Sequence, residues 1–114
     1  MLFRQLFDPK TSTYTYLLAD TDAHEAILID PVKEQTDRDA TLLEQLGLQL
    51  VATVETHVHA DHVTGAWLLR NRTGSDIIYP VTANVTGADR LVDEGDAIRF
   101  GRHAIVVRLT RPHR

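Results

Sequence analysis

Short apolar stretches rich in β-branched and aromatic residues alternate with turn-forming residues in the first third of the chain. Residues 2–7 and 14–19 have this composition, and residues 8–12 between them are turn formers, so the pattern predicts a β-hairpin. Residues 25–29 are predicted as a third strand. This strand ends at Asp30, because the proline that follows disfavours a helical conformation there.

Two stretches have the spacing of helices. Over residues 34–46 apolar side chains recur at helical intervals, and Gly47 follows as a stop signal. We expect this helix to cover one face of a sheet. A second helix is predicted over residues 63–70, where Trp67 is expected to pack in the core or at an interface rather than to contact a substrate.

The rest of the chain contains a buried strand, a shorter strand and a hairpin. Residues 48–55 are mostly apolar and β-branched, which predicts a buried strand. Residues 76–79 form a short strand that Pro80 closes, and residues 97–100 and 103–109 form a hairpin. Residues 84–93 are predicted to be irregular or weakly helical, since Gly87 opposes a long helix.

Three polar features beside these elements are expected to bind no ligand. The acidic residues 93–96 are predicted to be a solvated hairpin connection. His24 lies in a polar turn, and His103 is expected to start a strand beside water.

Composition limits the classes of protein that the chain can represent. With 114 residues it forms one domain at most. The formal net charge is −4 and the 12 basic residues are scattered, so we expect neither nucleic acid nor a membrane surface as a partner. No stretch has a signal-peptide pattern or the roughly 20 apolar residues of a membrane span, which predicts a cytoplasmic protein. There is no cysteine, so any metal must be bound by nitrogen and oxygen.

Three imidazoles and a carboxylate lie within residues 56–62, at the junction of a predicted strand and a predicted helix. In an extended segment residues two apart point to the same side, so His57 and His59 can face one ion, while Asp61 and His62 turn in from the helix start. Imidazole suits Zn, Fe, Cu or Ni, and a carboxylate widens the choice towards Fe and Mn. The alternative, in which Asp61 only caps the helix, explains none of the histidines. The cluster therefore predicts a metal site.

The sequence around this cluster resembles a known family. Residues 56–62, Thr-His-Val-His-Ala-Asp-His, followed by Val-Thr-Gly-Ala, look like the metallo-β-lactamase fold and, within it, the persulfide dioxygenases, also called sulfur dioxygenases. Similar agreement is found at residues 5–8, 14–20, 26–31 and 93–96. The resemblance implies an α/β (α+β) fold, the N-terminal half of an αββα sandwich, with one mixed sheet and helices on one outer face. Residues 1–114 would then be a truncated domain.

The resemblance also implies a ligand set and a reaction. His57 would be the first ligand of a mononuclear non-haem iron and His113 the second, while His59, Asp61 and His62 would lie beside the iron and orient ligands and water. Two histidines and one carboxylate leave three positions on Fe(II) open. Glutathione persulfide and dioxygen would react there to give sulfite and glutathione. The third ligand, an aspartate, would lie beyond the end of this sequence.

The surroundings of His113 depart from the family pattern. Where the family has a Thr-Pro-Gly-His-Thr turn, Arg111 and Pro112 take the positions of proline and glycine. Proline fixes φ near −65° and removes a backbone donor, so the family turn cannot be reproduced unchanged. His113 is therefore either the second ligand or a terminal residue without a metal role, and both alternatives stay open.

A hydrolase of the glyoxalase II kind is the second functional hypothesis. In that branch of the fold the same motif binds two metals, with His57 and His59 on one and Asp61 and His62 on the other, and zinc is the alternative to iron. A bridging hydroxide attacks a glutathione thioester. The motif alone does not separate these two chemistries.

A non-catalytic half-domain is the third hypothesis. Without a second half, the inner face of the sheet would be uncovered, and such an apolar patch must find a partner or aggregate. The residues expected on this face are Leu17, Ile27, Ile29, Val51 and Val106. We therefore expect a homo-oligomer or self-association through the sheet face, together with weak metal binding and little turnover by the chain itself.

Overall fold

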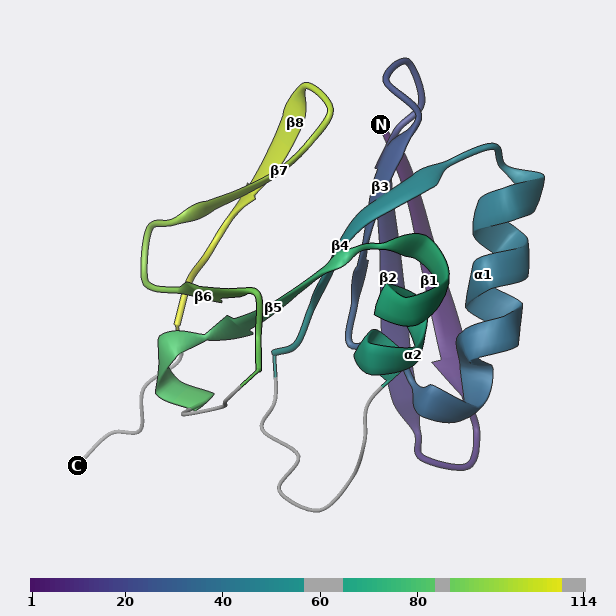
Figure 1. The fold of residues 1–114 in the computed structure, drawn as a ribbon, viewed down its shortest axis with the longest axis horizontal. Helices are drawn as coiled ribbons and strands as arrows, with labels where there is room; N and C mark the ends of the chain where they lie inside the picture. The colour runs from purple at the N-terminus through teal and green to yellow at the C-terminus, as the bar shows by residue number, and fades with distance from the viewer. Residues whose placement is uncertain (57–64, 84–86, 110–114) are drawn as a thin grey trace.

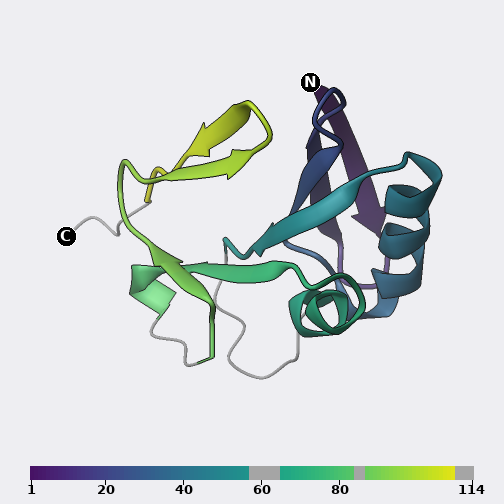
Figure 2. The ribbon, with the colours of Figure 1, turned by 45° about the horizontal axis from the view of Figure 1, so that its top comes forward.

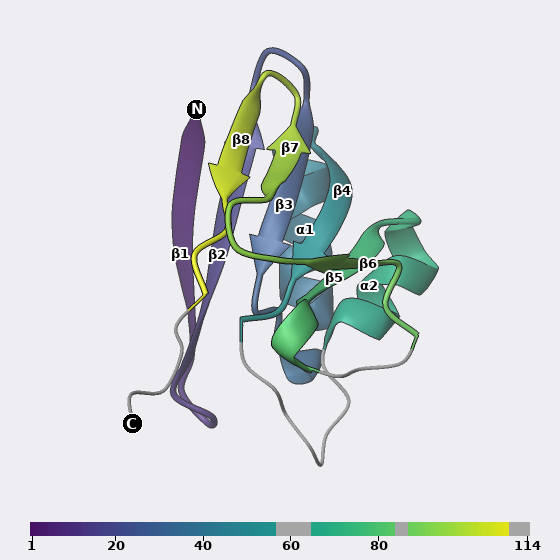
Figure 3. The same cartoon turned by 90° about the vertical axis from the view of Figure 1, so that its left-hand side faces the viewer.

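The protein folds into a central sheet with helices on one side and a β-hairpin on the other. The structure is a computed structural model that describes residues 1–56, 65–83 and 87–109. Within these residues, strands β1 to β6 form a six-stranded sheet and β7 and β8 form a separate two-stranded sheet. Figure 1 shows α1 and α2 beside the large sheet, and Figure 3 shows β7 and β8 in front of β3 with α1 behind it. The fold is thus the predicted mixed sheet with helices on one outer face.

Apart from β6, the strands and helices follow the predicted order along the chain. The strands are β1 (Leu2–Asp8), β2 (Thr13–Asp20), β3 (Glu25–Ile29), β4 (Gln49–Val54), β5 (Asp76–Pro80), β6 (Arg90–Val92), β7 (Ala97–Phe100) and β8 (His103–Val106). The helices are α1 (Thr36–Gln45) and α2 (Gly65–Thr73), with 3-10 turns η1 (Lys33–Gln35) and η2 (Val81–Ala83). None of the helices in the described part of the chain is long and apolar enough to cross a membrane.

The large sheet changes from antiparallel to parallel along its width. Its order is β1-β2-β3-β4-β5-β6; β1, β2 and β3 pair antiparallel, whereas β3, β4, β5 and β6 pair parallel. The carboxyl ends of β3 to β6 therefore meet at one edge of the sheet. In open α/β sheets this is the edge where ligands bind.

The two faces of the sheet carry separate hydrophobic clusters. On the helix side, Leu17 and Leu28 pack with Leu43 of α1 and Leu69 of α2. On the hairpin side, a second cluster joins the sheet to β7 and β8, and its buried members are Leu18, Ile27, Ala52, Val54, Ile78, Val92, Ile98 and Phe100. Because neighbouring strand residues point to opposite faces, the adjacent residues 17 and 18 belong to different clusters. Figure 2 shows the hairpin and the helices on either side of the sheet.

The predicted uncovered face is partly wrong. Leu17 faces α1 and is fully buried, and Ile27 is fully buried under the hairpin. Ile29 and Val51 are only partly buried, and Val106 is 53% exposed. The β7–β8 hairpin packs over β3 and covers much of the apolar sheet face that was expected to be exposed.

Helix α1 ends as its sequence predicts. Gly47 has φ +66, its N–H donates to the carbonyl of Glu44 at 3.1 Å, and the N–H of Leu48 donates to the carbonyl of Leu43 at 2.9 Å. This pair of bonds is the Schellman motif, in which the residue after the helix has a positive φ that glycine adopts freely. The chain then enters β4 directly.

Two sequence predictions about residues 84–96 are wrong. Arg90–Val92 forms β6, which pairs parallel with β5, although an irregular or weakly helical segment was expected. The acidic turn at residues 93–96 does not connect a hairpin, because it joins β6 of the large sheet to β7 of the small one. Its side chains still bind locally: Asp93 N–H donates to Asp96 Oδ2 at 2.7 Å, and Glu94 Oε1 accepts the N–H of Leu109 at 2.6 Å. Three residues are too few to show a period, so β6 had no clear signal.

Candidate metal centre

The motif predicted to bind metal begins at the carboxyl edge of the parallel strands. Strand β4 ends at Val54, Glu55 donates its N–H to the carbonyl of Ile78 in β5 at 3.0 Å, and Thr56 follows. Helix α2 is described from Gly65 onward. The strand before the motif and the helix after it are therefore confirmed, and both lie where the sequence predicted them.

The predicted metal ligands themselves lie outside the described residues. His57, His59, Asp61 and His62 fall within residues 57–64, and His113 within residues 110–114. The described residues contain no cluster of three or more His, Cys, Asp or Glu side chains that could bind a metal ion. His24 and His103 therefore belong to no such cluster among the described residues. His103 starts β8, and its ring lies 5.8 Å from that of Phe100.

Asp30 connects the end of β3 to the residue before the histidine motif. Its Oδ1 accepts the backbone N–H of Thr56 at 2.7 Å, and its Oδ2 accepts the Thr56 hydroxyl. The sequence predicted only that the strand ends at Asp30, before a proline. The structure shows that its carboxylate is bonded across to the next parallel strand, directly beside His57 in sequence. A carboxylate that holds the residue before a ligand can set the direction in which the chain enters the site.

The backbone of Asp30 is fixed from two further directions. Its N–H donates to the carbonyl of Val54 at 2.8 Å, and its carbonyl accepts the hydroxyl of Thr15, a fully buried residue of β2, at 2.8 Å. Asp30 has φ +56, which is uncommon for a residue with a side chain. These bonds stabilise a conformation that the residue would otherwise seldom adopt.

Two hollows open on either side of Thr56. One, of about 490 Å³, is lined mainly by hydroxyl-bearing residues of the β1–β2 hairpin together with Ile29, Asp30 and Thr56. The other, of about 580 Å³, shares Ile29 and Thr56 with the first and extends under β8, where its wall is mostly apolar. Thr56, the residue that precedes His57, thus lines both hollows, and the volume of each suits a small molecule.

A carboxylate network at the end of β1 braces the same region. Asp8 Oδ2 accepts the Thr11 hydroxyl at 2.6 Å, and Asp8 Oδ1 accepts Nε2 of Gln35 at 2.8 Å. These bonds, that of Thr11 first, keep the pKa of Asp8 below its ordinary value, since they stabilise the ionised carboxylate. Gln35 N–H in turn donates to the carbonyl of Val32 at 3.0 Å. Sequence reasoning assigned Asp8 only to a turn and missed this link, because a bond between residues 27 positions apart leaves no local pattern.

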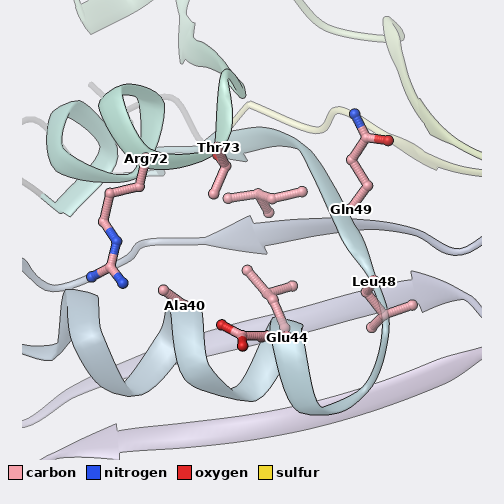
Figure 4. A pocket seen from close by; sticks show the side chains of 8 residues that line it. Ala40, Glu44, Leu48, Gln49, Arg72 and Thr73 are labelled. Carbon is pink, nitrogen blue, oxygen red and sulfur yellow. The ribbon is translucent and has the colours of Figure 1, made fainter.

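A third hollow lies on the helix side of the molecule. It has a volume of about 430 Å³ and lies between α1, the start of β4 and the end of α2. Figure 4 shows Glu44 and Arg72 on opposite sides of it, with Ala40 and Leu48 in the wall. It contains no histidine, and the predicted site chemistry does not involve it.

Comparisons with known proteins agree with the fold. The chain is 48% identical over 115 residues to the mitochondrial persulfide dioxygenase ETHE1 of Mus musculus, a match that covers 99% of this chain and 44% of that protein. The crystal structure of ETHE1 from Myxococcus xanthus superposes with a TM-score of 0.84 at 44% identity, covering 91% of this chain and 46% of that one. A hydroxyacylglutathione hydrolase of Chelativorans sp. (strain BNC1) is 31% identical over 91% of this chain and 41% of its own length.

The chain thus spans less than half the length of each of these relatives. Its similarity to the persulfide dioxygenases is higher than to the hydrolase and extends over nearly the whole of its sequence. The family model described as the metallo-beta-lactamase superfamily matches residues 8–113. Since this match includes the histidine motif and the strands β2 to β8, and covers more than half of the chain, the chain belongs to the metallo-β-lactamase superfamily.

Proposed function

We propose that the chain carries the first part of a persulfide dioxygenase active site, which oxidises glutathione persulfide with dioxygen to sulfite and glutathione. The observation that supports this most is that Thr56, the residue before His57 in the sequence, lines two hollows, in a chain 48% identical to a persulfide dioxygenase. In this proposal His57 and His113 bind Fe(II), and His59, Asp61 and His62 lie beside it. The donor set fits iron, because it contains imidazole and carboxylate and no thiolate.

The described residues would bind and orient the substrate. Bound Fe(II) would supply open positions at which the persulfide sulfur and dioxygen come together. The apolar wall of the larger hollow, which includes Val54, Val92 and Ile105, would keep water from the sulfur. The smaller hollow offers hydroxyls of Ser12, Thr13 and Tyr14 to polar parts of glutathione. Asp30 and Thr56 would fix the direction in which the chain leads into His57.

Metal content and a pair of histidine variants test this proposal. Under nitrogen, the chain is expected to bind about one Fe(II), weakly, and His57→Ala should lose it. His103→Ala is the matched control, since the ring of this histidine lies near that of Phe100 and the residue belongs to no predicted ligand set. Equal iron binding by the wild type and His57→Ala would refute the assignment.

The reaction class needs a second assay. Oxygen uptake with glutathione persulfide should exceed hydrolysis of a lactoyl-glutathione thioester, and both should be small in the 114-residue chain. Thioester hydrolysis together with two zinc ions per chain would favour the glyoxalase II kind of hydrolase instead. Rapid persulfide-dependent oxygen uptake would contradict the expected weak activity of the chain alone.

We also propose self-association through the hairpin side of β1 and β2. Four aromatic rings form a row there: Phe3 stacks on Tyr16 at 5.7 Å, and Phe7 packs on Tyr14 at 4.9 Å. Phe3, Phe7 and Tyr14 are about half exposed, and the hairpin β7–β8 covers the neighbouring strands but not these rings. A second copy offers an identical row, so the contact can be symmetric.

Light scattering measures this association directly. The wild type is expected to be dimeric or larger, and Phe3→Ser with Phe7→Ser should be monomeric. A wild type that stays monomeric at high concentration would exclude the contact. The expected cytoplasmic location stays a prediction, since the mouse relative is named as mitochondrial; imaging of a tagged chain in its own host would decide it.

A further inference from the structure

We propose that residues 30–32 act as a clamp that holds together the two ends of the segment carrying the predicted metal ligands. The two ends are Thr56, directly before residues 57–64, and Gly65, directly after them. The clamp would make Asp30 and Gly65 positioning residues for the metal centre, so this inference rests on the proposed function. It concerns only contacts among described residues.

Asp30 holds the first end. Both of its carboxylate oxygens bond to Thr56, one to the backbone N–H at 2.7 Å and the other to the side-chain hydroxyl. An aspartate that only forms a turn bonds to the backbone about two residues ahead. Here the partner lies 26 residues further along the chain, on a different strand. The carboxylate therefore connects two strands, and the turn is not its main role.

Pro31 and Val32 hold the second end. The N–H of Gly65 donates to the carbonyl of Pro31 at 3.2 Å. A Cβ atom on Gly65 would lie 2.9 Å from the Val32 carbonyl oxygen and 3.2 Å from the Pro31 carbonyl carbon. Both atoms belong to the backbone, so a side chain at position 65 would push α2 away from the turn. Glycine is the residue that allows this close approach.

Hydrogen bonds from β2, β4 and η1 hold the turn in place. Asp30 bonds through its N–H to Val54 and through its carbonyl to Thr15, and the Val32 carbonyl accepts the N–H of Gln35. Asp30 also keeps a positive φ directly before a proline, where an extended conformation is the usual one. An uncommon conformation that is held by its surroundings is often found where a functional group must be placed.

The clamp fixes the distance between the ends of an eight-residue segment, 57–64. Bringing the two ends of a chain segment together costs entropy, and contacts made before the metal binds remove that cost from metal binding. Loss of groups that orient metal ligands commonly weakens metal affinity by about 10- to 100-fold. We expect losses of this size when either half of the clamp is removed.

Amide hydrogen exchange tests the clamp without any metal. In Asp30→Ala the Gly65 amide is expected to exchange faster, although its own acceptor, the Pro31 carbonyl, is unchanged. In Gly65→Ala the Thr56 amide should exchange faster for the same reason. Asp20→Asn is the matched control: it removes a carboxylate that accepts backbone N–H groups elsewhere in the sheet, and it should leave both amides unaffected.

Cobalt titration tests the effect on the metal centre. Co²⁺ is added under nitrogen and its visible absorption followed, while thermal unfolding of each metal-free variant shows that it is folded. Asp30→Ala and Thr56→Val should bind Co²⁺ about tenfold or more weakly, whereas Thr56→Ser, which keeps the hydroxyl, should bind like the wild type. If Thr56 had a purely structural role, Thr56→Val and Asp20→Asn would lower Tm equally. Thr56→Val would then bind Co²⁺ as tightly as Thr56→Ser does.

The two proposals fail in different ways. If the wild type binds Co²⁺ and neither Gly65 exchange nor cobalt affinity changes in Asp30→Ala and Thr56→Val, the clamp is refuted and the metal centre stands. If the two amides are coupled but the wild type binds neither Co²⁺ nor Fe²⁺, the clamp exists as a structural unit and the proposed function is refuted.

Discussion

Asp20, the last residue of β2, and Asp30, which follows β3, use the same chemistry at opposite ends of this strand pair, with different consequences. Asp20 Oδ1 accepts the N–H groups of Asp22 and Ala23, and its Oδ2 accepts the N–H of Arg102 at 2.7 Å. It thereby fastens the tip of the β7–β8 hairpin to the sheet. Asp30 fastens Thr56 beside the predicted ligands. The Asp20 carboxylate thus connects the hairpin to the sheet over the core, and the Asp30 carboxylate connects β3 to the residue before the predicted ligands.

The difference between them lies in burial and backbone conformation. Asp20 is 3% exposed, and the backbone there is regular strand. Asp30 is partly exposed at the ligand edge and has a positive φ. Burial makes an anchor valuable for stability, whereas an exposed anchor contributes less to it. We therefore expect damage at the Asp20 anchor to appear in the free energy of unfolding, and damage at Asp30 to appear in metal affinity.

The largest expected effect is the loss of unfolding free energy in Gly101→Ala. This variant disturbs the Asp20 anchor, meaning the hydrogen bonds of the Asp20 carboxylate to the backbone N–H groups of Asp22, Ala23 and Arg102. Gly101 has φ +62, and an added Cβ would lie 2.5 Å from Asp20 Oδ2 and 2.8 Å from Ala23 Cβ. The left-handed conformation costs a residue with a side chain about 1–2 kcal/mol, and forced overpacking adds about 1–3 kcal/mol. Urea unfolding should show a loss of about 2–4 kcal/mol.

Gly95→Ala separates the two causes. Gly95 also has a positive φ, +85, but nothing lies within 4 Å of its Cβ position. It should lose only the conformational part, about 1–2 kcal/mol. Equal losses in the two variants would show that the close approach of Asp20 to Gly101 does not matter. Cobalt affinity per folded molecule should be unchanged in both.

The next effect is the pH dependence that Asp20 confers. Its pKa lies below the ordinary 3.8, first because of the Arg102 N–H and then the Ala23 N–H, which stabilise the ionised form. A group whose pKa is lower in the folded state stabilises the protein above the unfolded pKa, and this contribution is lost as pH falls through the folded pKa. Stability of the wild type should therefore fall below about pH 3.8.

Asp20→Asn should remove part of that acid dependence. The variant is expected to unfold several degrees lower at neutral pH and to lose less stability on further acidification. Asp8, whose pKa is also lowered, would supply the remaining dependence. Thermal unfolding from pH 7 to pH 2 measures both. If the variant and the wild type lose stability in parallel on acidification, the Asp20 anchor does not depend on its charge.

The sequence predicted most of the fold because most of it is local. The strands, the start of the hairpin and the Gly47 stop follow from periodicity and turn chemistry. The position of the histidine motif between β4 and α2 was predicted for the same reason. What the sequence did not reveal are the long-range bonds. Asp20 to Arg102 spans 82 residues, and neither residue has a neighbour that indicates the contact.

A register change also escaped the sequence pattern. Between β3 and β4 the pairing shifts after Ala26, so that Leu50 faces the helices while Ala52 and Val54 face the hairpin. An extra residue in one strand reverses the side on which later residues point. The assignment of Leu17 to the uncovered face is wrong for a different reason: alternation along β2 places Leu18 on the hairpin side and Leu17 on the helix side.

The smallest expected effect is that of Asp39→Asn. This variant sharpens the comparison of Asp20 with Asp30, because it removes a buried carboxylate that, in the part of the chain the structure describes, has no hydrogen bond to a residue distant in sequence. Asp39 in α1 is 1% exposed, and its Oδ1 bonds only to Nε of the adjacent Arg38, at 3.0 Å, among the bonds of the described residues. Burial raises its pKa above the ordinary value, and the charge of Arg38 offsets this only in part. A raised folded pKa means that stability is lost as pH rises through it, the opposite sign to Asp20.

Asp39→Asn keeps an acceptor for Arg38 and removes the buried charge, so at neutral pH it should change the free energy of unfolding by about 1 kcal/mol or less, in the stabilising direction. Urea unfolding at pH 7 and pH 4.5 checks this: a marked destabilisation at pH 7 would show that Asp39 is an anchor of the same kind as Asp20, and that backbone N–H donors are not what distinguishes the two.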